Sequence, residues 1–367
     1  ATPHAPRPSA SVMLRRGGEI LVCHRVSTVP SFPDYWAFPG GGVSRADRAA
    51  LDEHPEWFAN RDQDERAALV ALMREMIEEV GIVPGPNGLE QIDVENRMQI
   101  LQDKTAWHRL VDSGEISIED EGFVVISERT TPPLAPLRFR NHFFTVECNV
   151  EPILHSDERP EFDEYRWATP RALLDEWMAN EIRLPPPLVM ILRELLEDTI
   201  ENSIARMSST PPRKNTRIEF GPGVECLPLP TDTLPPSTHT NCYVLGLPGG
   251  DRVIIDPAAK CVDGLTQLQE KVDSILIEGS NIVGTIFTHR HQDHIGDLEA
   301  ISQLYTAPIW GSRETLDSII IKGETRLLQD GDLFNLDGVI WNVIETPGHC
   351  PGQLAFVSEA GIISADN

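Results

Sequence analysis

The chain has 367 residues, with 57 acidic and 31 basic side chains and a formal net charge of −26. This length predicts two domains, or at most three, and an apolar fraction of 40% is enough for ordinary hydrophobic cores. So acidic a surface repels phosphate backbones and anionic lipid. Nucleic acid and membranes are therefore not expected as partners.

Neither a membrane segment nor a disulfide framework is expected. Apolar runs stay well short of the roughly 18–20 residues that span a bilayer. The six cysteines are scattered and form no C-x-x-C pair: Cys23, Cys148, Cys226, Cys242, Cys261 and Cys350. In a chain of this length they are typical of reduced thiols, which predicts a cytoplasmic location.

The first half has the alternating strand and helix patterns of a mixed α/β domain. An alternating run over 11–25, interrupted by Gly17 and Gly18, predicts a β-hairpin. A Pro- and Gly-rich loop follows over 30–42, and a long helix is expected over 62–80. The other expected elements are strands at 122–127 and 142–148 and helices at 170–179 and 188–204.

Residues 208–217 are polar, rich in proline and locally basic, which is linker composition. They predict one domain over 1–206, a linker over 207–217 and a second domain over 218–367. The elements expected in the second domain are a strand hairpin at 242–258, helices at 264–277 and 296–304, and strands at 283–289, 339–345, 354–357 and 361–365.

Three carboxylates share one face of the helix expected at 62–80. Glu75, Glu78 and Glu79 fall in one sector because residues three and four apart are neighbours on a helix. Carboxylates crowded in this way repel one another unless they share hard cations, and Mg²⁺ and Mn²⁺ prefer oxygen ligands. Arg74 lies four residues before Glu78, close enough to orient it, and Gly81 ends the helix. An acidic, solvated helix face is the structural alternative.

The string from Arg74 to Ile82 resembles the end of the Nudix box, G-x5-E-x7-R-E-U-x-E-E-x-G-U, in which U is apolar. The upstream glycines Gly40, Gly41 and Gly42 are similar to the loop that opens the box. Segments 164–167 and 184–187 resemble the coenzyme A diphosphatase subgroup. The resemblance covers about residues 10–200 and implies an α/β/α sandwich with a mixed sheet.

Two departures from the box are visible. Gly41 and Arg74 are 33 positions apart where the pattern allows 14, so 19 residues are inserted, and we place them at about 44–62. The Glu expected eight positions before Arg74 is replaced by Arg66, with Glu65 one place away. The metal-binding half of the box is intact and the loop half is remodelled.

The resemblance implies hydrolysis of a nucleoside diphosphate linked to another group, with coenzyme A or acyl-coenzyme A favoured. Glu75, Glu78 and Glu79 would hold Mg²⁺ or Mn²⁺, with Glu78 and Glu79 in catalytic roles. Gly40, Gly41, Gly42 and Arg74 would form the substrate loop and its support. The general base stays open among Glu79, Glu121, Glu161 and Glu164.

A second cluster of metal-ligand types follows the strand expected at 283–289. His289, His291, Asp293 and His294 have H-x-H-x-D-H spacing, and His349 stands in a later loop that also follows a strand. Imidazole and carboxylate suit Zn²⁺, Fe or Mn. The i and i+2 histidines of an extended turn can face one ion while the Asp-His pair faces another. This pattern indicates a metal centre.

The cluster resembles the metallo-β-lactamase superfamily, with its glyoxalase II-like and β-lactamase-like-protein-2 branches most similar. The substrates of these branches include thioesters and single-stranded RNA. The resemblance implies an αββα sandwich that hydrolyses a thioester or other ester. By resemblance, His289, His291 and His349 bind a first metal, and Asp293 and His294 bind a second. Asp366 bridges both, Asp293 contributes to catalysis and Asp256 supports the ligands from outside. The sequence ends one residue after Asp366, so we expect a partial, C-terminally incomplete domain.

Two functions of different classes remain open. The first is a bifunctional, metal-dependent hydrolase with two active sites. The second is a nucleotide-binding sensor whose C-terminal half is an inactive, metal-stabilised interaction module. A homodimer is compatible with either function, and a small-molecule nucleotide is the expected partner of the first half.

Overall fold

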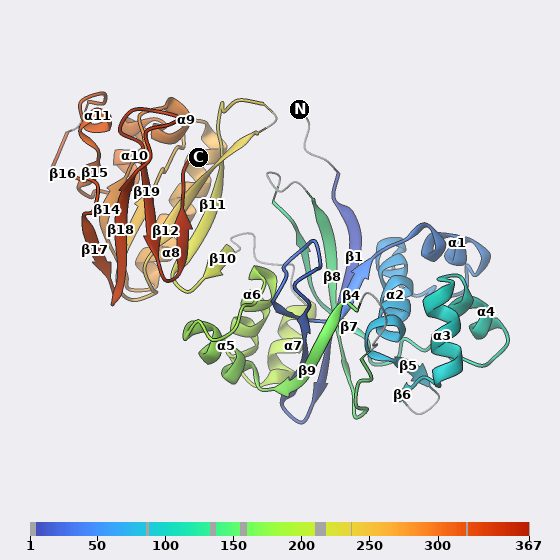
Figure 1. Cartoon of the computed structure of the whole chain (residues 1–367). Coiled ribbons are helices and arrows are strands. Elements are labelled where there is room, and N and C mark those ends of the chain that lie inside the picture. The colour runs from blue at the N-terminus through green and yellow to red at the C-terminus, as the bar shows by residue number, and fades with distance from the viewer. Residues whose placement is uncertain are drawn as a thin grey trace. The chain divides into compact units, whose positions relative to one another are not determined.

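The computed structural model describes residues 5–85, 88–132, 137–154, 160–209, 218–235, 237–320 and 322–366. The chain forms two compact units, one made of residues 4–131 and 135–213 and the other mainly of residues 214–367 (Figure 1). Helix α7 (Ile200–Ser209) continues into the expected linker, so residues 207–209 are helical. Residues 210–217, the rest of that linker, lie outside the described part of the chain.

A mixed seven-stranded sheet forms the centre of the N-terminal unit. Its main path is β3-β2-β1-β8-β7, while β4 pairs with β1 and β9 pairs with β2. Strands β1 and β8 are parallel, and the other pairs are antiparallel. The strands are β1 (Arg7–Arg16), β2 (Glu19–Arg25), β3 (Trp36–Ala37), β4 (Gly40–Gly42), β7 (Val124–Thr130), β8 (Phe139–Glu147) and β9 (Phe162–Ala168).

Alternation along β1 builds a core on each face of this sheet. Val12 and Leu14 pack with helix α2 (Gln63–Glu75), whereas Met13 packs with α5 (Pro170–Met178) and α6 (Pro186–Leu195). Successive side chains of a strand point to opposite faces, so one strand serves both cores. Helices therefore cover both faces of the sheet (Figure 1), which confirms the expected α/β/α sandwich.

Two of the helices expected in this unit differ from the observed ones. The helix expected at 62–80 changes after α2 into a π-helix, η1 (Met76–Val80), and the helix expected at 188–204 is two helices, α6 and α7. The amide of Asn202 donates to Thr199 Oγ1, which starts α7 afresh. The remaining elements are α1 (Arg45–Glu53), β5 (Ile82–Gly85), β6 (Gly88–Gln91), α3 (Val94–Gln102) and α4 (Ala106–Asp112).

Two sheets pack face to face in the C-terminal unit. The larger has the order β10-β11-β12-β13-β14-β15-β16 and the smaller β17-β18-β19-β20. Trp310, Trp341 and Phe356 belong to the core between them, and α8 (Val262–Ile277) covers the outer face of the larger sheet. The other elements are β10 (Ile218–Gly221), β11 (Val224–Pro230), β12 (His239–Leu245), β13 (Asp251–Ile255), β14 (Asn281–Ile286), α9 (Gln292–Ile295), α10 (Leu298–Leu304), β15 (Ile309–Gly311), α11 (Arg313–Leu316), β16 (Thr325–Leu327), β17 (Leu333–Leu336), β18 (Val339–Glu345), β19 (Leu354–Ser358) and β20 (Gly361–Ile363).

Strand direction brings several chain segments to one end of this sandwich. Strands β13 and β14 are parallel, so the residues that follow them emerge at the same edge. Both β18 and β20 run antiparallel to β19, so they also end together. The amide of Leu354 donates to the Thr288 carbonyl, which ties the start of β19 to the loop after β14. Four strand-end loops can therefore contribute to a single site.

The remaining sequence-level expectations concern membranes and thiols. Among the helices that the structure describes, none combines the length and apolar character needed to cross a bilayer. All six cysteines are free thiols; Cys261 is exposed and the other five are buried.

Candidate functional sites

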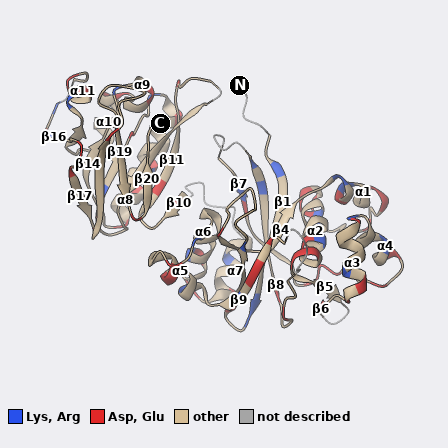
Figure 2. Cartoon of the chain, in the orientation of Figure 1, with Lys and Arg blue, Asp and Glu red and all other residues tan. Residues whose placement is uncertain are grey.

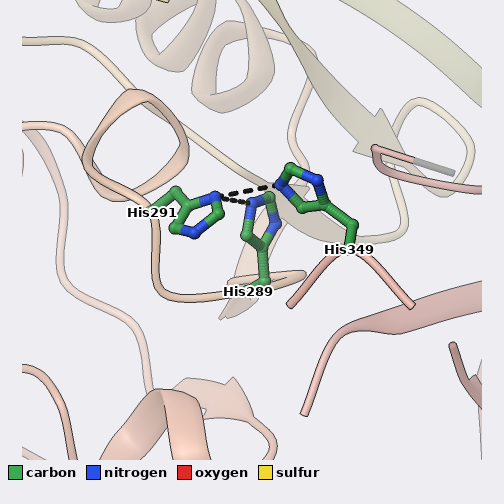
Figure 3. Close-up of side chains that lie close together, drawn as sticks. All are labelled: His289, His291 and His349. Carbon is green, nitrogen blue, oxygen red and sulfur yellow. Dashed lines mark hydrogen bonds between the residues drawn. The ribbon is translucent and has the colours of Figure 1, made fainter. Parts of the chain in front are cut away.

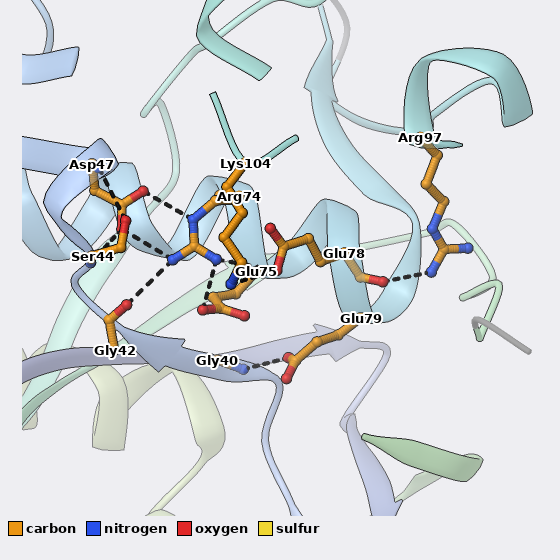
Figure 4. A network of polar contacts seen from close by, with 10 residues as sticks. All are labelled: Gly40, Gly42, Ser44, Asp47, Arg74, Glu75, Glu78, Glu79, Arg97 and Lys104. Carbon is orange, nitrogen blue, oxygen red and sulfur yellow. Dashed lines mark hydrogen bonds and ion pairs between the residues drawn. The ribbon is translucent and has the colours of Figure 1, made fainter. Parts of the chain in front are cut away.

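Arg74 is the centre of the carboxylate site in the N-terminal unit, and its side chain is 1% exposed. Its Nη1 donates to Glu75 Oε1 at 2.8 Å and to Glu78 Oε2 at 3.1 Å. On the other edge of the guanidinium, Nε and Nη2 donate to the two carboxylate oxygens of Asp47 at 2.9 and 3.0 Å (Figure 4). One cation thus offsets three acidic groups.

Sequence reasoning missed Asp47, which belongs to helix α1. The box has its first acid six positions after a glycine, and position 47 is six after Gly41. The extra residues therefore lie between Asp47 and Arg74, so the insertion begins after Asp47 and not at residue 44. Arg66, the residue found by counting back from Arg74, instead donates to the carbonyls of Trp57 and Pro55. Counting forward from the glycines would have found the acid.

Local capping holds Asp47 in place. Ser44 is the N-cap of α1 and accepts a hydrogen bond from the Asp47 amide, while the Asp47 carboxylate accepts one from the Ser44 amide. Burial would raise the pKa of Asp47, but the hydrogen bonds from Arg74 and Ser44 outweigh it and hold the pKa below its usual range.

The expected glycine loop contacts two of the three carboxylates. The amide of Gly40 donates to Glu79 Oε2 at 2.7 Å, and the carbonyl of Gly42 accepts from Arg74 at 3.2 Å. A Cβ on Gly41 would overlap the Glu75 carboxylate, so a larger residue there would displace that side chain. The structure thus brings Gly40, Gly41 and Gly42 to the site that the sequence analysis assigned to them.

The three glutamates are adjacent, but they do not converge on one point. Glu75, Glu78 and Glu79 do not form a group whose ligand atoms all lie within 4.8 Å of one another. The π-helical turn η1 alters the angular spacing that an α-helix would give them. Glu75 and Glu78 share Arg74, Glu78 also pairs with Lys104, and Glu79 accepts from the Gly40 amide (Figure 4).

The site nevertheless fits a bound cation. Glu78 Oε1 and Glu79 Oε1 are buried and accept no hydrogen bond from the described residues. Burial, opposed by Arg74 and reinforced by Glu78, raises the pKa of Glu75 to about 7. Burial and the charges of Glu75 and Glu161 raise the pKa of Glu79 well above its usual value. Buried, mutually repelling oxygen ligands of this kind suit Mg²⁺ or Mn²⁺.

The three outer candidates for the general base differ in position. Glu161 lies near enough to Glu79 for its charge to raise the pKa of Glu79, and it pairs with Arg25 at 2.7 Å. Glu121 lies on an exposed turn, and Glu164 is an exposed residue of β9. Glu161 is thus the one of these three that the structure connects with the carboxylate site.

Three histidines meet at the end of the C-terminal sandwich (Figure 3). His289 Nε2 and His349 Nε2 each lie 3.0 Å from His291 Nδ1. His289 and His291 come from the loop after β14, and His349 comes from the loop after β18. Separations near 3 Å are close to those of ligands that share one metal at about 2.0–2.1 Å, so these three imidazoles fit one Zn²⁺-type ion.

His294 and Asp366 extend the histidine site. His294 Nε2 lies 3.3 Å from Asp366 Oδ1, and His349 Nε2 lies 3.5 Å from Asp366 Oδ2. His289, His294 and Asp366 form a second group whose ligand atoms all lie within 4.8 Å. Asp293 belongs to neither triad, although its charge contributes to raising the pKa of His294. The structure thus collects five of the six predicted ligands and leaves Asp293 beside them.

Asp256 contacts His294 and Thr288 and holds them in position at the histidine site. Its Oδ2 is 2.8 Å from His294 Nδ1 and accepts from Thr288 Oγ1 at 2.6 Å, while Oδ1 accepts from the Thr288 amide. Its φ of 49° lies in the left-handed region, which Asp tolerates better than most residues. A carboxylate on the second nitrogen of a ligating histidine fixes the tautomer and ring orientation.

His289 and His294 differ in the direction in which the site shifts their pKa. Burial and the positive charge of His294 lower the pKa of His289 to about 4. Burial would also lower the pKa of His294, but its hydrogen bond to Asp256 and the charges of Asp256 and Asp366 raise it to about 8. His289 is therefore neutral near pH 7, as metal binding requires.

Comparison with known families agrees with both sites. The NUDIX domain model matches residues 5–186, and the Metallo-beta-lactamase superfamily model matches residues 236–366. The first covers the carboxylate site and the second covers the whole histidine site.

Similar curated proteins divide in the same way. A putative nudix hydrolase 7 of Caenorhabditis elegans is 29% identical over 52% of this chain and 60% of that protein. A hydroxyacylglutathione hydrolase of Klebsiella pneumoniae is 28% identical over 36% of this chain and 49% of that protein. An atrochrysone carboxyl ACP thioesterase of Pseudocercospora fijiensis is 28% identical over 35% of this chain and 37% of that protein. The chain spans about half the length of the curated relatives it matches.

These matches and the two sites lead to one assignment: the chain joins a NUDIX domain, over residues 5–186, to a domain of the metallo-β-lactamase superfamily, over residues 236–366, and so combines two hydrolase families.

Proposed function

We propose that the chain is a bifunctional hydrolase with two separate metal-dependent sites. The NUDIX half would hydrolyse a nucleoside diphosphate linked to another group, with coenzyme A or acyl-coenzyme A favoured. The single observation that carries this proposal is the pair of buried carboxylate oxygens, Glu78 Oε1 and Glu79 Oε1, that lack a hydrogen-bond partner beside the buried Arg74. Such oxygens are costly unless a ligand satisfies them.

Each residue of the carboxylate site has a distinct proposed role. Glu75, Glu78 and Glu79 would hold Mg²⁺ or Mn²⁺, which when bound neutralises diphosphate charge and activates water. Arg74 and Asp47 position Glu75 and Glu78, and the Gly40 amide positions Glu79. We assign Glu79 as the group that accepts the proton of the attacking water, because burial and the charges of Glu75 and Glu161 raise its pKa and so favour proton uptake.

The C-terminal half would hydrolyse a thioester or another ester. Its relatives include a hydroxyacylglutathione hydrolase and an ACP thioesterase, which supports a substrate of this class. His289, His291 and His349 would hold the first ion, and His294, Asp366 and Asp293 a second. Zn²⁺ is favoured over Fe or Mn because three imidazoles dominate the site, and when bound it makes water nucleophilic near neutral pH.

Acyl-coenzyme A would connect the two activities, since it carries both a thioester and a diphosphate. Cleavage of both bonds by one chain would produce a free acid and two smaller phosphate-containing fragments. The free thiols favour a reducing, cytosol-like compartment. A homodimer is compatible with this function.

The test is a mass-spectrometric substrate panel on the full chain with Mg²⁺, Mn²⁺ and Zn²⁺. The panel contains coenzyme A, an acyl-coenzyme A, ADP-ribose, NADH and a diadenosine polyphosphate. Glu78→Gln and His291→Ala serve as reciprocal controls. We expect Glu78→Gln to abolish diphosphate cleavage and spare thioester cleavage, and His291→Ala to do the reverse.

Three results would contradict the proposal. Diphosphate cleavage that persists in a Glu78→Gln, Glu79→Gln double variant would show that the NUDIX site lies elsewhere. Thioester cleavage unaffected by His291→Ala would do the same for the histidine site. Binding of a panel compound without turnover, seen as a raised melting temperature, would favour the sensor function instead.

A further inference from the structure

A third cluster of metal-ligand side chains lies in the NUDIX unit, apart from both sites described above. It consists of Glu53, His54 and His108, each of which offers a ligand atom within 4.8 Å of the other two. Glu53 ends α1 and His54 is its C-cap, while His108 belongs to α4. We call these residues the Glu53 cluster. Helix α1 lies within the segment between the glycine loop and Arg74, which is longer than the box pattern allows.

We propose that the Glu53 cluster binds a divalent transition-metal ion of the Zn²⁺ type. Two imidazoles and one carboxylate are a common donor set for this class of ion. A fourth donor is adjacent, because Asp112 Oδ1 lies 3.4 Å from His54 Nε2. Two ligands at about 2.0–2.1 Å from one tetrahedral ion are separated by roughly this distance.

The His54 ring is held in position before any ion binds. It stacks on Trp57 with ring centroids 4.1 Å apart and planes 7° from parallel. Its Nδ1 lies 3.3 Å from Glu56 Oε1, on the side of the ring away from Asp112. A ligating histidine usually donates its second ring N–H to a carboxylate, and Glu56 supplies that acceptor if Nε2 faces the ion.

The local charge also favours a cation. The cluster stands at the C-terminal end of α1, whose last turn has no basic residue. The carbonyl end of a helix carries partial negative charge, so a cation there is stabilised. Carboxylates of Glu53, Glu56 and Asp112 add to this field, and Figure 2 shows acidic residues on both α1 and α4.

An ion at this position would join two segments that both contact the carboxylate site. Helix α1 carries Asp47, which holds Arg74, and Lys104, just before α4, pairs with Glu78 at 3.6 Å. The ion would therefore stabilise the segment that carries Asp47, without touching the reacting groups itself. Its role would be structural support of the NUDIX site.

The experiment measures bound Zn²⁺ in the full chain after dialysis against low free Zn²⁺ with millimolar Mg²⁺ present. All variants are made in a His289→Ala, His349→Ala background, which removes ligands from both groups of the histidine site. We expect His108→Ala to lose one equivalent of Zn²⁺ relative to that background. His24→Ala is the matched control, because His24 also pairs with a carboxylate in this unit, Asp163 at 2.7 Å.

A second variant guards against misfolding. Glu53→Gln replaces an exposed carboxylate by an amide of the same shape, and it should weaken Zn²⁺ binding about 10-fold or more while circular dichroism stays unchanged. The same variants should lose the Co²⁺ absorption bands that two imidazole ligands produce. Equal Zn²⁺ content in the His108→Ala, Glu53→Gln and His24→Ala variants would overturn the proposal.

Discussion

The carboxylate site and the histidine site both bring metal-ligand side chains together, but different interactions hold those side chains in place. Glu75, Glu78 and Glu79 come from one continuous helical segment, and their repulsion is offset by a buried arginine that a distant aspartate holds. The ligands of the histidine site come from loops after β14, β18 and β20, and its imidazole ligands do not repel one another as carboxylates do. The first site depends on ion pairing and the second on strand geometry.

Because of this difference, substitutions at the two sites should affect different quantities. Removing an ion partner from the carboxylate site leaves buried charge without compensation, which costs folding free energy directly. Removing support from the histidine site chiefly affects the tautomer and orientation of imidazoles, which costs metal affinity. The following predictions test that division, from the largest effect to the smallest.

Arg74→Met should destabilise the NUDIX unit by about 3–5 kcal/mol, because it leaves the fully buried Asp47 without its partner. Urea unfolding at pH 7 measures the effect. The control is Arg15→Met, which breaks a pair with the 72% exposed Glu147 and should cost about 0–1 kcal/mol. Equal losses of unfolding free energy in Arg74→Met and Arg15→Met would show that the buried ion pair does not stabilise the carboxylate site more than an exposed pair does.

The same ion pair should respond to acid. The pKa of Asp47 is lower in the folded chain than in the unfolded chain, so its contribution is present above the unfolded value and is lost as the pH falls through the folded value. The difference in unfolding free energy between the wild type and Asp47→Asn should therefore shrink below about pH 4. If the difference in unfolding free energy between the wild type and Asp47→Asn stays constant at acidic pH, Asp47 does not stabilise the fold as a carboxylate paired with Arg74.

Asp256→Asn should weaken Zn²⁺ binding at the histidine site by about 10–100-fold, because an amide cannot hold His294 in the same tautomer. Chelator competition measures the affinity. Asp251→Asn, at the exposed start of β13, the strand that precedes Asp256, is the control and should leave the affinity unchanged. Diphosphate cleavage should be unaffected by either change, and a parallel loss of both activities would argue against independent sites.

Mg²⁺ binding at the carboxylate site should strengthen by about tenfold as the pH rises from 6 to 8. The pKa of Glu75 is raised to about 7, so a proton must leave before a cation binds. The raised pKa also means that the metal-free chain loses stability as the pH rises through that value. Melting temperatures with and without Mg²⁺ measure both effects, and Glu75→Gln should remove most of the pH dependence.

Lys104→Ala should have the smallest effect, at or below about 1 kcal/mol, since Lys104 is 58% exposed and lies 3.6 Å from Glu78. Urea unfolding measures it alongside the Arg74 variant. A loss of unfolding free energy close to that of Arg74→Met would show that the exposed Lys104 stabilises the site as much as the buried Arg74 does.

Local patterns were sufficient for much of the fold. Alternation predicted the hairpin of β1 and β2, and composition predicted a division near residue 210. Helix α1 was missed because most of its nine residues are polar and its apolar face is short. The break between α6 and α7 was missed because apolar residues continue on both sides of it.

The sequence by itself determined the two families and predicted the residues proposed for each site, because ligand types at fixed spacing can be recognised in a linear sequence. Tertiary structure alone decided that Asp47 holds Arg74, that η1 spreads the three glutamates, and that Asp293 stands outside both histidine triads. It also placed His54 beside His108, residues from separate helices. Partners far apart along the chain meet through packing and hydrogen bonds that spacing does not encode.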